Sequence, residues 1–144
     1  MDRIPPHQVR RVAVVGTGLI GAGWTVWFLA RGLEVIACDP APGARRRLES
    51  FIREAWPACL ELGAAPGADP GRWSFAADAT AVAAEADFIQ ENGPDREEAK
   101  RAIFADLDRR ARPEIVIASS SSALLMTPIQ GGLDHPGRCV LGHP

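Results

Sequence analysis

Short apolar runs alternate along this chain with longer stretches of helical periodicity, a pattern typical of parallel strands joined by crossover helices. The run at 11–15, Arg-Val-Ala-Val-Val, is rich in β-branched side chains and is ended by Gly16. It predicts a strand buried on both faces. The same criteria predict further strands at 33–38, 73–75, 87–90, 115–118 and 139–141.

Helical stretches fall between most of these strands. A helix is predicted over residues 19–31, and Gly32 follows it at a position that favours the left-handed conformation of a helix cap. Residues 44–62 are rich in Arg and Glu, and we expect an interruption near Trp56-Pro57 because proline cannot donate inside a helix. A short helix is expected at 78–85. A longer amphipathic helix is expected at 96–112, with an apolar side formed by Ala99, Ala102, Ile103 and Leu107.

Composition restricts the class of protein. The chain has 144 residues, 47% of them apolar and 24% charged, which predicts one globular domain over 1–144 after a polar lead-in at 1–10. Its 16 basic and 18 acidic residues give a net charge of −2, so we do not expect a nucleic-acid partner. No apolar run approaches the roughly 20 residues of a membrane span, and three widely spaced cysteines favour a reducing, cytoplasmic location.

A glycine-rich turn follows the first predicted strand. Residues 16–21, Gly-Thr-Gly-Leu-Ile-Gly, match the G-x-G-x-x-G pattern, and the turn opens a predicted helix. In this pattern Gly16 permits the tight turn, Gly18 lets a pyrophosphate approach the backbone, and Gly21 allows close helix–strand packing. Thr17, Leu19 and Ile20 complete the loop, whose free N–H groups lie at the positive end of the helix dipole.

Asp39 ends the second predicted strand, about 20 residues beyond the turn. A carboxylate there accepts hydrogen bonds from the adenosine ribose and repels a 2′-phosphate, which selects NAD over NADP. The alternatives are a turn residue before Pro40 and, for the site as a whole, FAD or another adenine nucleotide. A nucleotide-binding regulatory module without catalysis also remains open.

Two further segments carry a resemblance to a known family. One is 90–100, Gln-Glu-Asn-Gly-Pro-Asp-Arg-Glu-Glu-Ala-Lys, and the other is 118–124, Ala-Ser-Ser-Ser-Ser-Ala-Leu. Together with the glycine turn and His143, they resemble the 3-hydroxyacyl-CoA dehydrogenases over 12–144. The resemblance implies NAD as cofactor and a Rossmann-type, doubly wound, mostly parallel α/β fold with an inserted helical pair at about 41–68. It also implies a small hydroxy acid or acyl-CoA substrate and a homodimeric full-length protein.

The same resemblance assigns roles to individual residues. Asp95 and Lys100 match an acid and a lysine that line the nicotinamide side, although the family usually has Glu where this chain has Asp95. Ser122 matches a serine that touches the substrate hydroxyl and the nicotinamide, and His143, 21 residues later, matches the catalytic histidine. Imidazole suits the removal of a hydroxyl proton. Without the resemblance, Lys100 fits a solvated helix residue, the serines a polar loop or helix cap, and His143 a loop residue.

One branch of the family is favoured. Typical acyl-CoA enzymes have Asn where this chain has Ser120, and a four-serine run resembles the carnitine 3-dehydrogenase and lambda-crystallin branch. Trp24 and the segments 39–43 and 91–94 point the same way. In the family a further segment supplies an acid that pairs with the histidine, and a mostly helical domain closes over the substrate. Neither lies within these 144 residues, so we expect this domain to be inactive alone.

Overall fold

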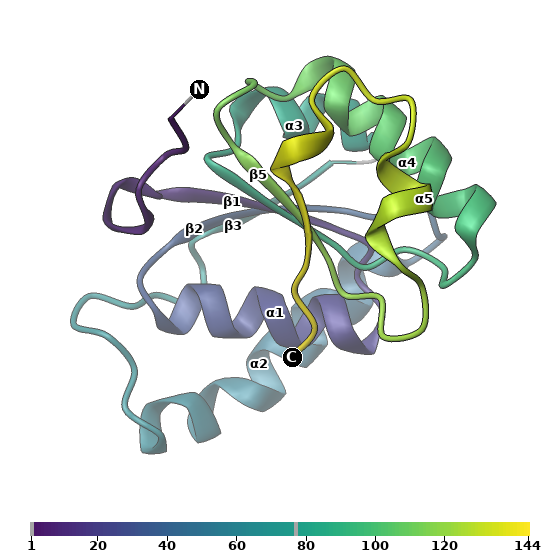
Figure 1. Ribbon diagram of the computed structural model, residues 1–144. Coiled ribbons are helices and arrows are strands. Elements are labelled where there is room, and N and C mark those ends of the chain that lie inside the picture. Colours follow the sequence, from purple (N-terminus) through teal and green to yellow (C-terminus); the bar gives the residue numbers. More distant parts are fainter. Residues whose placement is uncertain (1, 77) are drawn as a thin grey trace.

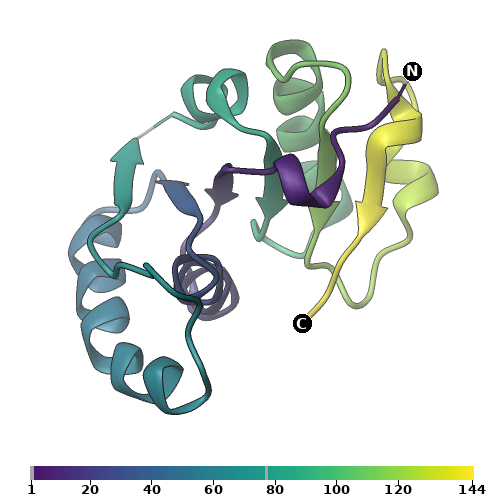
Figure 2. The ribbon, with the colours of Figure 1, turned by 90° about the vertical axis from the view of Figure 1, so that its left-hand side faces the viewer.

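A six-stranded, entirely parallel sheet forms the centre of the molecule in the computed structural model, which describes residues 2–76 and 78–144 (Figure 1). The strand order is β3-β2-β1-β4-β5-β6, which is the doubly wound arrangement. Figure 2 shows the strands in this order across the sheet. The strands are β1 (Arg11–Val15), β2 (Glu34–Cys38), β3 (Trp73–Ala76), β4 (Phe88–Glu91), β5 (Val116–Ser119) and β6 (Cys139–Leu141).

Helices cover both faces of the sheet and create two apolar cores (Figure 1). On one face α1 (Leu19–Ala30) and α2 (Ala44–Glu61) pack over β1 and β2. The other face carries α3 (Ala79–Glu85), α4 (Glu97–Arg110) and α5 (Met126–Gln130). Two short 3-10 turns complete the elements, at Pro6–Gln8 and Pro136–Arg138. Among the helices of the described residues, none is both long and apolar enough to pass through a bilayer.

The fold class and all six predicted strands are confirmed, but the segment after β2 differs from the expectation. The expected helical pair, interrupted near Trp56-Pro57, is one continuous helix, α2, with Pro57 in its interior. Leu48 and Ile52 of α2 are buried against α1 and the sheet, and this packing offsets the hydrogen bond that Pro57 cannot make. Tertiary packing therefore overrides the local signal for a break.

The buried face of α4 is rotated from the predicted one. Ala102 is exposed, whereas Lys100, Phe104 and Leu107 are buried. These three residues follow the i, i+4, i+7 spacing of a helical stripe, so the lysine belongs to the core-facing side. A charged group in this position needs a partner inside the protein.

Because all strands are parallel, their carboxyl ends lie along one edge of the sheet. Successive strands are added on one side of β1 as far as β3 and on its other side from β4 onwards, and ligands of doubly wound sheets bind at such a switch point. The loops after β1, β2, β4, β5 and β6 all begin at this edge. These loops, together with the first turns of α1 and α4, contain every residue that the sequence analysis placed in the candidate site.

Candidate dinucleotide-binding site

The turn between β1 and α1 requires glycine at two positions. Gly16 has φ +87°, and a Cβ on it would come within 2.7 Å of the carbonyl oxygen of Asn92. A Cβ on Gly21 would lie 1.8 Å from the carbonyl oxygen of Gly16. Gly16 and Gly21 therefore allow the turn to lie against the β4 exit and against the first turn of α1.

Gly18 is free of such crowding. A Cβ on Gly18 would meet nothing within 4 Å, so the fold itself does not require glycine there. Gly18 is the N-cap of α1, and no side chain among the described residues caps it. The N–H groups of the first helical turn thus remain available for an anion.

A pocket of about 640 Å³ opens beside this turn. It extends from the end of β2 to the β4–α4 loop, with one side formed by the backbone of the glycine turn. Its size is in the range of small-molecule and cofactor sites. The lining residues are Val15, Gly16, Gly18, Cys38, Asp39, Pro40, Ala41, Asp78, Ala79, Asn92, Gly93, Pro94 and Ile103.

Asp39 lines the pocket and is held by the glycine turn. Its Oδ2 accepts hydrogen bonds from the Thr17 N–H at 2.8 Å and the Thr17 hydroxyl at 3.0 Å, and its Oδ1 accepts from the Ala41 N–H at 2.9 Å. An ionised carboxylate offers about four acceptor positions, so one remains for a ligand hydroxyl. This contact explains why the turn and the acid belong to one site.

The potential near Asp39 is negative. Burial first, and then the carboxylates of Asp39 and Asp78, raise the pKa of the Cys38 thiol to about 11. Cys38 is therefore a neutral thiol at pH 7 rather than a nucleophile. A second negative group, such as a 2′-phosphate, is disfavoured at this end of the pocket.

A hydrogen-bond network joins the loops after β1, β4 and β5. The Asn92 amide donates to the carbonyl oxygens of Gln90 at 3.1 Å and of Gly16 at 3.4 Å. The Ser120 hydroxyl donates to Asn92 Oδ1 at 2.6 Å and accepts from Trp24 Nε1 at 3.0 Å and Gln90 Nε2 at 2.8 Å. Gln90 Nε2 also donates to the carbonyl oxygen of Gly142 at 3.1 Å, which ties in the β6 exit.

Lys100 and Asp95 are not among the residues that line the 640 Å³ pocket. Lys100 is 1% exposed, and its Nζ lies 2.9 Å from Glu91 Oε2. Asp95 is exposed, accepts a hydrogen bond from the Ser121 hydroxyl at 2.5 Å, and lies 4.0 Å from Lys100 Nζ. The structure thus brings Asp95, in the β4–α4 loop, close to Lys100, in the first turn of α4.

Ser122 and His143 lie on neighbouring loops at the same edge of the sheet. Ser119 and Leu141 are paired residues at the ends of β5 and β6, and Ser122 and His143 follow them by three and two residues. Both side chains are exposed. His143 Nδ1 lies 2.8 Å from the carbonyl oxygen of Pro144.

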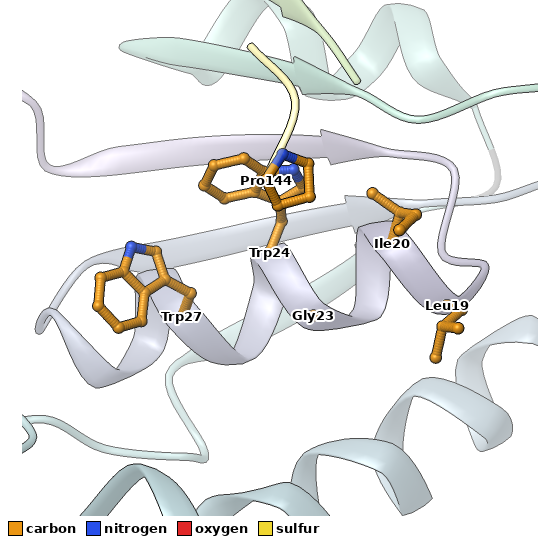
Figure 3. A pocket seen from close by; sticks show the side chains of 6 residues that line it. All are labelled: Leu19, Ile20, Gly23, Trp24, Trp27 and Pro144. Carbon is orange, nitrogen blue, oxygen red and sulfur yellow. The ribbon is translucent and has the colours of Figure 1, made fainter. Parts of the chain in front are cut away.

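An apolar hollow of about 470 Å³ lies along α1 (Figure 3). Leu19 and Ile20 line it rather than the 640 Å³ pocket, so their part in that pocket is through their backbone. Trp24 and Trp27 lie along the same side of the helix, and Pro144 closes the hollow above Trp24. The Arg31 guanidinium lies 4.5 Å from the ring centroid of Trp27.

Sequence reasoning assigned no site role to Glu91 or Asn92. For Glu91 a signal existed, because Lys100 sits on the apolar stripe of its helix and a buried lysine needs an acidic partner. For Asn92 no local signal exists, since, apart from the Gln90 carbonyl, its contacts are to the β1 turn and to the β5 loop, both far away in the sequence.

The sequence matches the family model described as "3-hydroxyacyl-CoA dehydrogenase, NAD binding domain" over residues 11–144. The chain belongs to this family. Its cofactor is therefore NAD, and the site fits NAD: the glycines Gly16 and Gly18, the free N–H groups of the helix start and an acid lie on one pocket.

Curated relatives extend the comparison. The chain is 48% identical over 139 residues to an L-carnitine dehydrogenase of Streptomyces griseus and 46% identical over 139 residues to one of Streptomyces coelicolor. Each match covers 96% of this chain but only 42% and 44% of those proteins, so the chain spans less than half of their length. Among solved structures, 3-hydroxybutyryl-CoA dehydrogenase from Escherichia coli superposes with a TM-score of 0.81 at 27% identity, covering 92% of this chain and 29% of that one.

Proposed function

We propose that this domain holds NAD(H) for the oxidation of a small L-3-hydroxy acid, with carnitine as the substrate class. The observation that carries the proposal is the Asp39 carboxylate, bound to the glycine turn and lining a pocket of cofactor size. An acid held beside a glycine turn that exposes its backbone recognises a ribose and a pyrophosphate together.

In this proposal the backbone of 16–21 binds the pyrophosphate, and Asp39 accepts hydrogen bonds from the adenosine ribose. Asp95, in the β4–α4 loop, and Lys100, in the first turn of α4, act at the nicotinamide side, where this loop borders the pocket at Gly93 and Pro94. Bound NAD supplies the hydride acceptor. Ser122 contacts the substrate hydroxyl and the nicotinamide.

His143 is the proposed base. A neutral imidazole takes the hydroxyl proton as hydride leaves the same carbon. The exposed ring has no carboxylate bound to it among the described residues, so we expect the orienting acid to lie in the remainder of the longer protein. We also propose that the complete enzyme is a cytoplasmic homodimer, and the free thiols of all three cysteines are consistent with that compartment.

Carnitine is favoured over an acyl-CoA thioester by two features. The relatives named above are L-carnitine dehydrogenases, and Ser120, at the centre of the network between β4 and β5, replaces the Asn of typical acyl-CoA enzymes. Comparable turnover of 3-hydroxybutyryl-CoA and carnitine by the complete enzyme would contradict this preference.

Fluorescence titration of the 144-residue chain tests the binding function. NADH should bind more tightly than NADPH, AMP or FAD, because NADPH brings a 2′-phosphate to Asp39, AMP lacks the pyrophosphate, and the matching family binds NAD. A lack of NADH binding at millimolar concentration would reject the proposal. Tighter binding of FAD, or of AMP alone, would favour another adenine-nucleotide module.

A further inference from the structure

A buried glutamine lies beside the exit of β6. Gln90, in β4, is 2% exposed. Its Nε2 donates to the carbonyl oxygen of Gly142 at 3.1 Å and to the Ser120 hydroxyl at 2.8 Å. Gly142 immediately precedes His143, the proposed base. A side chain from the interior of the sheet therefore binds the backbone next to the residue that would remove the substrate proton.

The sheet explains how the amide of Gln90 reaches a strand that is not its neighbour. β5 lies between β4 and β6, and Gln90 pairs with Ala118 of β5, which pairs in turn with Val140 of β6. Residues in register share one face of the sheet, and Gly142, two residues beyond Val140, belongs to the same face. A Cβ on Gly142 would lie 3.4 Å from Ala118 Cβ and 4.0 Å from Gln90 Oε1. The small side chain of Ala118 leaves room for the longer Gln90 to cross β5.

A tryptophan of α1 supports the same segment from the other side. Trp24 Nε1 donates at 3.0 Å to the Ser120 hydroxyl oxygen, which also accepts from Gln90. The Trp24 ring lines the hollow along α1 together with Pro144, the residue after His143 (Figure 3). The residue before His143 is therefore bound to Gln90, the residue after it shares a hollow with Trp24, and Ser120 joins the two side chains.

Both backbone polar groups of Gly142 are fixed in this arrangement. Its N–H donates to the carbonyl oxygen of Ser119 at 2.8 Å, which continues the β5–β6 ladder, and its carbonyl accepts from Gln90. Glycine has more backbone freedom than any other residue, so each of these bonds restricts the direction in which the chain leaves β6. The exposed His143 ring contacts only the Pro144 carbonyl among the described residues, so its place depends on that direction.

We propose that Gln90 is a positioning residue for His143, acting through the backbone of Gly142, and that Trp24 assists it through Ser120. This inference rests on the proposed function, because it requires that His143 is the base. The imidazole must lie within hydrogen-bond distance of the substrate hydroxyl. A displacement of about 1 Å in such a site can reduce the rate by about 100-fold.

The test is a double-mutant cycle with Gln90→Met, His143→Ala and the double variant, in a longer protein with the length of the curated relatives. Methionine has a similar volume but no donor, so the Gly142 carbonyl loses its bond while the packing remains. Gln90→Met should reduce kcat about tenfold or more. NADH affinity should change less than about twofold, because Gln90 does not line the 640 Å³ pocket. In the His143→Ala background, Gln90→Met should change kcat less than about twofold, because the base that Gln90 positions is already absent.

Gln130→Met is the matched control, because Gln130 is a half-buried glutamine of α5 and should leave kcat unchanged when replaced. Trp24→Phe is a second test variant, since it removes the Nε1 donor and keeps an aromatic ring against Pro144. It should reduce kcat by about threefold, the effect of one neutral hydrogen bond, and should have no effect in the His143→Ala background. If Gln90→Met does not fold, Trp24→Phe completes the cycle.

Four results would overturn the inference. The first is wild-type kcat in folded Gln90→Met. The second is an equal loss of kcat in both backgrounds, which would show that Gln90 acts independently of His143. The third is a parallel loss of kcat, NADH affinity and Tm, which indicates a purely structural role. If His143→Ala itself turns over normally, the proposed function fails and this inference with it.

Discussion

We propose that a single carboxylate, Asp39, determines the choice between NAD and NADP. The sequence predicted it from its distance to the glycine turn, and the structure adds that Thr17 donates to it through both its N–H and its hydroxyl. Lys100 shows the opposite case. Its place on the buried side of helix α4 indicates that an acidic partner is needed, but only the structure shows that this partner is Glu91, at the end of β4.

Asp39→Ala should shift preference from NAD towards NADP. The variant loses a hydrogen bond to a charged group, typically about 1.5–3 kcal/mol, so NADH affinity should fall roughly tenfold to a hundredfold. NADPH should gain relative affinity, because the charge that repels the 2′-phosphate is removed. Titration of both cofactors measures the ratio, with Asp69→Ala, an exposed loop carboxylate, as control. A wild-type ratio in folded Asp39→Ala would contradict the role of Asp39.

At the scale of elements, the strands were predictable and some helical features were not. Runs of β-branched residues such as 11–15 are local signals, and the structure buries them as expected. The continuity of α2 through Pro57 and the rotated face of α4 depend on packing against other elements. The burial of Arg138 depends on Asp108, 30 residues earlier in the chain.

Gly18→Val tests the turn as an element. A Cβ at Gly18 would meet nothing within 4 Å, and the φ of −62° suits any residue, so the fold should survive. The new side chain occupies the space in which the pyrophosphate must approach the backbone, so NADH binding should be lost. Gly23→Ala, also in open space on α1, is the control and should bind normally. Unchanged NADH affinity in folded Gly18→Val would mean that the turn is only a helix entry.

The Arg138–Asp108 pair fastens the chain before β6 to helix α4. Burial alone would raise the pKa of Asp108, but hydrogen bonds from Arg138 and from the His135 and Asp134 backbone outweigh it and lower that pKa. Arg138 Nε donates to Asp108 Oδ1 at 2.9 Å, and both side chains are nearly fully buried. The pair fixes the start of β6 at the edge of the sheet, and His143 follows the end of this strand by two residues.

Asp108→Asn should therefore lower the free energy of unfolding by about 3–5 kcal/mol at pH 7, because a buried arginine loses its counter-charge. Asp106→Asn, on the same helix but in an exposed pair with Arg109, should cost less than about 1 kcal/mol. Since the folded-state pKa of Asp108 lies below its unfolded value of 3.8, its contribution is present above that pH and is lost as the pH falls through the folded-state pKa. Urea unfolding between pH 2 and pH 7 should show the difference between wild type and Asp108→Asn shrinking below about pH 4. A constant difference would rule out this linkage.

At the scale of the whole molecule, the domain carries a cofactor pocket and an exposed apolar surface on different sides of the glycine turn. Leu19 is 76% and Trp27 is 47% exposed, and they line the hollow along α1 (Figure 3). Val140 and Leu141 of edge strand β6 are also exposed. Such surfaces favour association with other protein. The curated relatives have more than twice the length of this chain, so the chain represents only part of such an enzyme.

These features predict that the 144-residue chain binds NADH but does not turn over any 3-hydroxy acid. Hydride transfer needs a cofactor, a base, a group that orients the base, and a site closed to water. The chain provides the cofactor site, whereas His143 is exposed and its Nδ1 contacts only a neighbouring carbonyl among the described residues. A longer protein with the length of the curated relatives should be active, and His143→Ala in it should reduce kcat by at least about 100-fold. His7→Ala, another exposed histidine, is the control and should leave kcat unchanged. Substantial activity of the 144-residue chain alone, or normal turnover by His143→Ala in the longer protein, would show that the base lies elsewhere.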